Sequence, residues 1–211
     1  MQKKMRSGFY LILSIPFFVV SYILFVCKYE SFLNDYKKCR EALLNAISDR
    51  SSCDFSNISR ILILAEDHRN QYHYGVDFIG IVRSLKIKFL TGRSQGASTI
   101  EQQFIRAITK RKERNLRRKI REQLLAVFVR AKFSREDINY AYLCNAYYGE
   151  KNIGKIGVLD LWGKGCSDYE IVSYIKFPVP SKKSLTHDGK IKRRVDHISK
   201  IELKKLGLIW L

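Results

Sequence analysis

The sequence predicts an all-α protein, in which a helical body follows one N-terminal transmembrane helix. The chain of 211 residues is 46% hydrophobic and has only 3 prolines, which fits a globular, helix-rich body and not a disordered one. Its first apolar stretch is long enough to cross a membrane, and later segments begin with a helix-capping pattern before apolar residues. At this length we expect one domain with an appendage.

The apolar stretch 7–27 contains no charged residue, and a helix of about 20 residues crosses a hydrocarbon core of about 30 Å. Lys3, Lys4 and Arg6 precede it, so the positive-inside rule assigns residues 1–6 to a cytoplasmic tail and the body to the outside. A cleaved signal peptide is the alternative. The stretch is long for one, however, and no A-x-A cleavage site follows, so we expect a transmembrane anchor.

Charge and cysteine content limit the partners. Lys and Arg number 39 against 20 Asp and Glu, a formal net charge of +19, which favours nucleic acid, anionic lipid or a phosphorylated substrate. The 5 cysteines show no metal-binding spacing. Cys39 and Cys53 could pair outside the cell, and buried free thiols are the other reading.

The segments after the anchor read as follows. Residues 28–59 form a polar, partly helical stalk and linker, and residues 60–211 form the body. Apolar residues recur at intervals of three and four over 114–132, which predicts an amphipathic helix. Ser134 and Ser167 each precede an acidic residue at capping-box spacing, and prolines at 178 and 180 precede a basic C-terminal helix at 190–205.

Glu66 opens the first group of candidate site residues, which continues with Asp67, His68, His73 and Asp77. A carboxylate at the end of the apolar run 61–65 is partly desolvated, which shifts its pKa towards the range useful for a general base. The group could also be a solvated turn with an ordinary polar network. His73 alone reads as a structural histidine.

A loop turns into a helix at residues 95–103. Ser98 or Thr99 can cap that helix, and Glu101 stands at capping-box spacing from Ser98. A helix N-terminus also attracts anions such as phosphate, so both a capping and a binding role are open.

A basic run lies between residues 106 and 121. Arg114, Arg118 and Glu122 are spaced four residues apart and share one helix face, where several cations could contact a pyrophosphate. Glu122 lies among its counter-charges and suits orientation or charge support better than proton abstraction. A solvated basic face or a nucleic-acid helix is the alternative. The run lacks interleaved aromatics and an exported domain would not meet nucleic acid, so we expect no nucleic-acid partner.

These stretches, in this order, resemble the peptidoglycan glycosyltransferases of glycosyltransferase family 51. The motif E-D-x-x-F-x-x-H-x-G-x-D is met by Glu66, Asp67, His73, Gly75 and Asp77, with Asn70 in the aromatic position. The motif G-[AG]-S-T-I-T-Q-Q runs from Gly96 to Gln103, with Glu101 in place of a threonine, and R-K-x-x-E is met by Arg118, Lys119 and Glu122. A fourth motif, I-L-E-x-Y-L-N-x-x-x-F-G, is kept at Ile138, Tyr142, Leu143 and Gly149 and altered at Tyr140, Cys144 and Tyr148.

The resemblance implies a lysozyme-like helical glycosyltransferase domain that polymerises lipid II into glycan strands and releases undecaprenyl pyrophosphate. Glu66 and Glu122 would be the catalytic residues, with Glu66 as general base. The substrate-binding residues would be Asp67, His73, Ser98, Thr99, Gln102, Gln103, Arg106, Arg114, Arg118 and Lys119. No cofactor is certain. A divalent cation, Mg or Mn, could assist, with Glu122 as its candidate ligand.

The resemblance also implies the surroundings. Residues 78–89 would lie at the membrane surface, and the protein would be a single-pass protein of the bacterial cytoplasmic membrane with its catalytic domain on the periplasmic or extracellular side. Its partners would be lipid II, the nascent glycan strand, membrane lipids and other cell-wall synthesis proteins. No transpeptidase module follows before Leu211, so we expect crosslinking by separate transpeptidases.

Two other functions fit the same residues. A lysozyme-like glycan hydrolase would also use a leading glutamate, but a neutral glycan needs no pyrophosphate-binding stripe. An inactive membrane-tethered scaffold that binds the lipid-linked precursor is the second alternative, because the fourth motif is altered.

Overall fold

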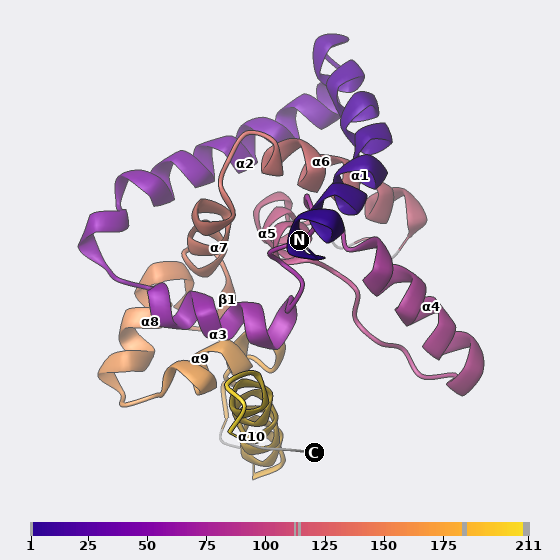
Figure 1. The fold of residues 1–211 in the computed structure, drawn as a ribbon. Helices are drawn as coiled ribbons and strands as arrows, with labels where there is room; N and C mark the ends of the chain where they lie inside the picture. Colours follow the sequence, from indigo (N-terminus) through magenta and orange to yellow (C-terminus); the bar gives the residue numbers. More distant parts are fainter. Residues whose placement is uncertain (1, 112, 114, 183–184, 209–211) are drawn as a thin grey trace.

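The computed structural model describes residues 2–111, 113, 115–182 and 185–208, and over these residues the chain is mostly helical (Figure 1). The all-α prediction is confirmed. The helices in chain order are α1 (Gln2–Val26), α2 (Glu30–Ser48), α3 (Ser56–Glu66), α4 (Phe78–Thr91), α5 (Ile100–Thr109), α6 (Leu116–Arg130), α7 (Arg135–Leu143), α8 (Gly154–Gly163), α9 (Asp168–Lys176) and α10 (Leu185–Lys205). A short 3₁₀ helix at Arg50–Ser52 and two short strands complete the described elements.

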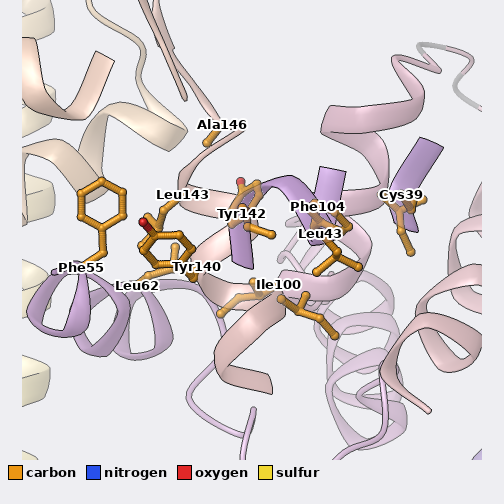
Figure 2. Close-up of a cluster of buried hydrophobic side chains, with 14 of the residues drawn as sticks. Cys39, Leu43, Phe55, Leu62, Ile100, Phe104, Tyr140, Tyr142, Leu143 and Ala146 are labelled. Atoms are coloured by element: carbon orange, nitrogen blue, oxygen red, sulfur yellow. The ribbon is translucent and has the colours of Figure 1, made fainter. Parts of the chain in front are cut away.

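The core lies where α2, α3, α5 and α7 meet (Figure 2). Leu43 of α2, Leu62 of α3 and Phe104 of α5 are fully buried there. Because apolar burial stabilises a fold by about 25 cal/mol per Å² of surface removed from water, this cluster holds the helices that carry the candidate site residues.

Helix α2 belongs to this core, so the expectation of a polar stalk over residues 28–59 is wrong. Phe32, Cys39 and Leu43 on one face of α2 are at most 1% exposed. The Asp35 carboxylate on the same helix accepts hydrogen bonds from Arg111, at 3.0 Å, and from Arg121 of α6, at 2.7 Å. This packing was not predicted, because many charged residues lie between the buried positions and their pattern is typical of a solvent-exposed segment.

Helix α1 is the described helix that is long and apolar enough to cross a membrane, over Ser7–Val26, with a mean hydropathy of 2.4. Its length and composition agree with the prediction. One side of it packs on α6, where Phe18 and Phe25 contact Phe128. The Ser21 hydroxyl donates to the Leu124 carbonyl oxygen at 2.9 Å, so one side of α1 is attached to the body between Phe18 and Phe25.

The capping patterns are partly confirmed. Ser134 caps α7, and Ser167 with Glu170 forms a capping box at the start of α9. The hydroxyl of Thr99, and not of Ser98, caps α5. Asn115 caps α6, so this helix begins at Leu116.

A small hairpin was not predicted. Strands β1 (Tyr147–Gly149) and β2 (Asn152–Ile153) pair antiparallel, and Gly149 also bridges to Val179. Gly149 has φ +154°, and a Cβ there would lie 2.8 Å from the Val179 carbonyl oxygen.

The five cysteines are free thiols in this structure, so the Cys39–Cys53 pairing is absent. Burial raises the pKa of the Cys39 thiol to about 12.

Candidate active site

Glu66 is the last residue of α3 and lies at the wall of a cleft. Its Oε1 accepts a hydrogen bond from Arg194 of α10 at 2.6 Å, and its Oε2 accepts one from Gln103 of α5 at 3.2 Å. Its side chain is 17% exposed. Each carboxylate oxygen can accept a further hydrogen bond, so Glu66 is oriented by two partners and still able to accept a proton.

Asp67 and His73 do not face the cleft. They are 5% and 0% exposed, and the His73 Nε2 lies 2.9 Å from the nearer Asp67 oxygen. Asp67 also accepts from the backbone N–H of Ile100 at the start of α5. In this structure both side chains are turned away from the cleft, and the substrate-binding role expected for them stays a prediction. The contacts of Asp67 with His73 and with the Ile100 backbone N–H connect the segment after Glu66 to the start of α5.

Thr99 and Gln102 are buried as well, and they hold the same region. The Thr99 hydroxyl and the Gln102 side-chain amide both donate to the Gly75 carbonyl oxygen, at 2.8 Å and 3.3 Å. Gly75 has φ +92°, and a Cβ there would lie 2.5 Å from the Ala126 carbonyl oxygen. The contacts of Thr99 and Gln102 in this structure join the Gly75 turn to α5, and the substrate contacts expected for them stay a prediction.

Glu122 lies on α6 between two guanidinium groups. Arg106 donates to both of its oxygens, at 3.1 Å and 3.0 Å, and Arg118 forms an ion pair with it one helical turn away. The Glu122 side chain is only 4% exposed, whereas that of Arg106 is 40% exposed. The structure thus brings Arg106, Arg118 and Glu122 together, as expected. Arg114 lies outside the described residues.

Lys119 lies beside this network. Its ammonium donates to the Ser98 hydroxyl at 2.9 Å and to the Gln102 side-chain oxygen at 2.7 Å. Burial, together with the positive charges of Arg106 and Arg118, lowers the pKa of Lys119 to about 8, although Glu122 acts in the opposite direction. A partly desolvated cation whose direct partners are neutral is well suited to an anionic ligand.

A cleft of about 520 Å³ connects several of these groups. It is lined by Glu66, Ser98, Gln103 and Arg106, together with Arg83 of α4 and with Lys176 and Arg194 of the C-terminal part of the chain. The volume lies within the range of small-molecule sites. His68 also lines it, and burial with the nearby Arg69 and Arg83 lowers the pKa of this histidine, which favours its neutral form.

The site roles of Arg194 and Arg83 were not predicted from the sequence. Arg194 is 128 residues from Glu66, so no local spacing connects them. The basic character of the C-terminal helix was visible in the sequence, but which cation turns inward depends on how α10 packs on α3 and α9. Burial of Ile191 and Ile198 sets that orientation, and Arg194 is one turn from each on the same helix.

The residues around Glu122 do not suit a divalent cation in this arrangement. Both of its oxygens bind guanidinium groups, and Lys119 adds a third positive charge. A group of another kind lies elsewhere: Asp67, His73 and Glu101 are buried and offer one ligand atom each, all within 4.8 Å of one another. Among the described residues, this Asp–His–Glu group could hold a metal ion.

Comparison with known proteins points to one family. The transglycosylase family profile matches residues 42–160 of this chain, which is more than half of it. Penicillin-binding protein 1A of Escherichia coli (strain K12) is 38% identical over 96 residues, which are 45% of this chain and 11% of the relative. Penicillin-binding protein 1A of Aquifex aeolicus is 34% identical over 99 residues, 46% of this chain and 14% of the relative.

A third relative, penicillin-binding protein 1B of Haemophilus influenzae, is 30% identical over 118 residues, 54% of this chain and 15% of the relative. The matched part therefore spans only a small fraction of each relative's length. It includes α3 with Glu66, α5 with Gln103 and Arg106, and α6 with Glu122, which supply part of the cleft and the Glu122 network.

Proposed function

The chain belongs to the transglycosylase family, and from this premise we propose that it is a peptidoglycan glycosyltransferase, which polymerises lipid II into glycan strands and releases undecaprenyl pyrophosphate. The observation that carries the proposal is the position of Glu66 in a cleft that also contains Arg106 and Arg194, next to the Lys119 and Glu122 network. A carboxylate beside several cations suits a reaction in which a hydroxyl attacks and a pyrophosphate leaves.

In the proposed reaction, Glu66 removes the proton from the attacking sugar hydroxyl of the acceptor. The hydroxyl oxygen forms a bond to the anomeric carbon of the donor as the bond between that carbon and the phosphate oxygen breaks. The electron pair of the broken bond leaves with the pyrophosphate, and the proton remains on Glu66 until water removes it. Gln103 and Arg194 hold the carboxylate in one orientation, which is needed for a positioned base.

The leaving group develops negative charge, and preorganised cations stabilise such charge in the transition state. Arg106 and Lys119 are the described cations best placed for this role. The Arg106 side chain is 40% exposed, and its guanidinium forms an ion pair with the buried Glu122 carboxylate. We assign Arg118 to the support of Glu122, and Ser98 to the orientation of Lys119. Arg114 remains a candidate phosphate ligand by resemblance.

We place the protein in the cytoplasmic membrane of a bacterium, with its catalytic body on the outer side. Helix α1 exposes most of its apolar surface, since only 17% of its most apolar window is buried. Helix α4 exposes a second apolar surface, with Phe89 96% exposed. Both surfaces suit lipid, and α4 brings Arg83 into the cleft, so a lipid-linked substrate could reach Glu66 from the membrane. Resistance to extraction by alkaline carbonate tests the anchoring of the full chain.

The nascent glycan strand would be the second substrate, and transpeptidases and other cell-wall synthesis proteins are the proposed protein partners. A glycan hydrolase remains the alternative function that the same glutamate would serve. The cations around Glu122 favour transfer, because cleavage of a neutral glycan releases no pyrophosphate. An inactive binding scaffold is the third alternative, since the fourth motif is altered at Tyr140, Cys144 and Tyr148. Tyr142, which the motif keeps, donates its hydroxyl to Gln103 beside Glu66 and favours the active form.

The test is product analysis with the purified full chain in detergent or vesicles. We expect labelled lipid II to be converted to glycan polymer, and the Glu66→Gln variant to bind lipid II without forming polymer. Cleavage of finished glycan would instead identify a hydrolase. Binding of lipid II with no product from the unmodified chain would identify a scaffold and overturn the proposed transferase.

A further inference from the structure

A second cavity lies beside α3 and is separate from the cleft. Its volume is about 500 Å³, and it shares no lining residue with the cleft. Ser59 and Ile63, one turn apart on α3, line it on one side, and Asn139 and Tyr140 of α7 line it on another. Phe55 contacts Tyr140 at the start of α3, with ring centroids 5.3 Å apart (Figure 2). The volume is within the range of small-molecule sites.

Three side chains of this cavity stand where the chain departs from the motifs that it resembles. Asn70 occupies the aromatic position of the first motif, and Asn139 and Tyr140 occupy the leucine and glutamate positions of the fourth. Asn70 and Asn139 are 2% and 3% exposed. Two large apolar side chains are thus replaced by smaller carboxamides in the wall of one cavity. Space and polarity arise together there, from changes that lie far apart in the sequence.

The two carboxamides have unused capacity for hydrogen bonds. The Asn139 Oδ1 is buried and makes no hydrogen bond to a described residue. The Asn70 Nδ2 reaches the Asp67 carboxylate only at 3.4 Å. Buried polar groups without partners are rare and costly, and a carboxamide offers both an acceptor and donors. A ligand that carries an N–H and a carbonyl oxygen, as a peptide group does, would satisfy them.

The charged side chains of the cavity favour a ligand with charges of both signs. Arg50 and Arg60 line the cavity, and each forms an ion pair with an acid outside it. Asp54 accepts a hydrogen bond from the backbone at the start of α3. Glu136 and Lys205 are exposed residues of the lining, and neither forms an ion pair with a described residue. A neutral glycan would leave both unpaired, whereas an amine and a carboxylate on one ligand would pair with both.

We propose that this cavity binds a short peptide that has a free amino group and a free carboxylate. A peptide N–H of the ligand would donate to the Asn139 side-chain oxygen, and its carbonyl oxygen would accept from a carboxamide of the wall. Glu136 and Lys205 would bind the charged ends. Hydrogen bonds to the main chain of a ligand are a common basis of peptide recognition. The proposal does not depend on the proposed glycosyltransferase activity.

The experiment is calorimetric titration of the full chain in detergent with three probes. They are tri-alanine with free ends, tri-alanine acetylated and amidated at its ends, and the trimer of N-acetylglucosamine. We expect one molecule of free tri-alanine to bind per chain with a Kd on the order of 0.1–1 mM, which is ordinary for so small a ligand. The blocked peptide should bind about tenfold more weakly because it has no charged ends, and the trisaccharide should not bind.

Three variants connect the binding to this cavity. Asn139→Leu, which restores the residue of the resembled motif, should raise the Kd for tri-alanine more than about tenfold. It should also raise the melting temperature by a few degrees, because an apolar side chain replaces a buried amide without a partner. Lys205→Gln should weaken the free peptide several-fold and leave the blocked peptide unchanged. Asn45→Leu, at an exposed position of α2 outside the cavity, is the control and should leave the Kd unchanged.

The proposal is overturned if tri-alanine at about 10 mM does not bind to the folded unmodified chain. It is also overturned if Asn139→Leu binds the peptide as tightly as the unmodified chain does, which would place the peptide elsewhere. Tighter binding of the trisaccharide than of tri-alanine would identify a glycan site and contradict the proposed ligand. Because these titrations contain no lipid II, their outcome is independent of whether the chain polymerises it.

Discussion

The residues in and around the cleft have two roles. Some are exposed to the cleft and can contact a substrate, and others are buried behind it and hold the exposed residues in position. Glu66 and Arg106 are partly exposed in or beside the cleft. Asp67, His73 and Gln102 lie behind it and are at most 5% exposed. The division matters for mutation, because a change in the buried set alters the position of Glu66 and not its chemistry.

Lys119 gives a prediction for the pH dependence. With its pKa lowered to about 8 by burial and neighbouring arginines, Lys119 is positively charged below that pH and neutral above it. If this cation supports the leaving pyrophosphate, the rate of polymer formation should fall as the pH rises through about 8. The measurement is the initial rate on lipid II between pH 6.5 and 9.5.

The control is Lys119→Arg, which keeps a positive charge across this range. The initial rate of the Lys119→Arg variant should not decrease as the pH rises through about 8, even if this rate is lower than that of the unmodified chain at every pH. An identical alkaline fall in the variant and the unmodified chain would show that another group is responsible.

At the scale of single residues, the sequence identified Glu66, Glu122 and the basic partners of Glu122 because their motifs are local. It could not separate Thr99 and Gln102, which are buried, from Gln103, which lines the cleft. Adjacent helical residues point in different directions, and which of them faces the core depends on how α5 packs against α7 and the Gly75 turn.

At the scale of elements, α10 contributes to the site from the far end of the chain. Arg194 donates to the Ala65 carbonyl oxygen and to Glu66, so it closes the end of α3 as well as orienting the base. Figure 1 shows α10 packed at the lower edge of the body, near α9. The last helix therefore takes part in the cleft although it lies outside the family match, which ends at residue 160.

Arg194→Ala should lower the rate of polymer formation by about tenfold or more, because Glu66 loses a charged hydrogen bond worth about 1.5–3 kcal/mol. Arg193→Ala is the matched control, since Arg193 is exposed and donates only within α10, to the Gly189 carbonyl oxygen. Equal effects of the two changes on the initial rate would contradict the role given to Arg194.

The Gly75 turn supports a prediction about stability. Gly75→Ala should destabilise the fold by about 2 kcal/mol or more, since the residue has a left-handed φ and its new Cβ would meet the backbone of Ala126. For a chain of this size the melting temperature should fall by about 4–8 °C. Gly163→Ala, where nothing lies within 4 Å of the added Cβ, should change it by less than about 2 °C. A similar melting temperature for both variants would show that the turn tolerates a side chain.

At the scale of the whole molecule, α1 and α4 together present apolar surface, and α4 reaches the cleft through Arg83. Phe17 of α1 and Phe78 of α4 are in contact, with ring centroids 5.4 Å apart. Helix α4 then extends away from the body in Figure 1, and it carries Val82, Leu85 and Phe89 on its exposed side. This arrangement suits a protein that receives its substrate from a lipid surface.

Phe89→Glu should weaken the use of lipid-linked substrate by raising KM for vesicle-embedded lipid II about tenfold, because a charge replaces an apolar contact with lipid. The melting temperature should not change, as Phe89 is 96% exposed. Leu185→Glu, at a 91% exposed position on α10, is the control and should leave KM unchanged. An unchanged KM for Phe89→Glu would place the lipid contact elsewhere.

The features that could not be predicted from the sequence are mostly those that depend on the packing of the whole molecule. The helical class and α1 followed from composition and hydropathy. The packing of α2 into the core did not, because Asp35 and the buried residues around it are interspersed with lysines and arginines. The hairpin at Tyr147–Ile153 was also missed, since each strand has at most three residues and depends on contact with Val179.

The most direct test of the central claim is the rate at which Glu66→Gln forms glycan polymer from lipid II, compared with the unmodified chain at equal concentration. The account predicts a loss of at least about 10²-fold, with lipid II binding and melting temperature retained, because the substitution keeps the shape of the side chain and removes its ability to accept a proton. Polymer formation by Glu66→Gln at a rate within a few-fold of the unmodified chain would contradict the assignment of Glu66 as the base.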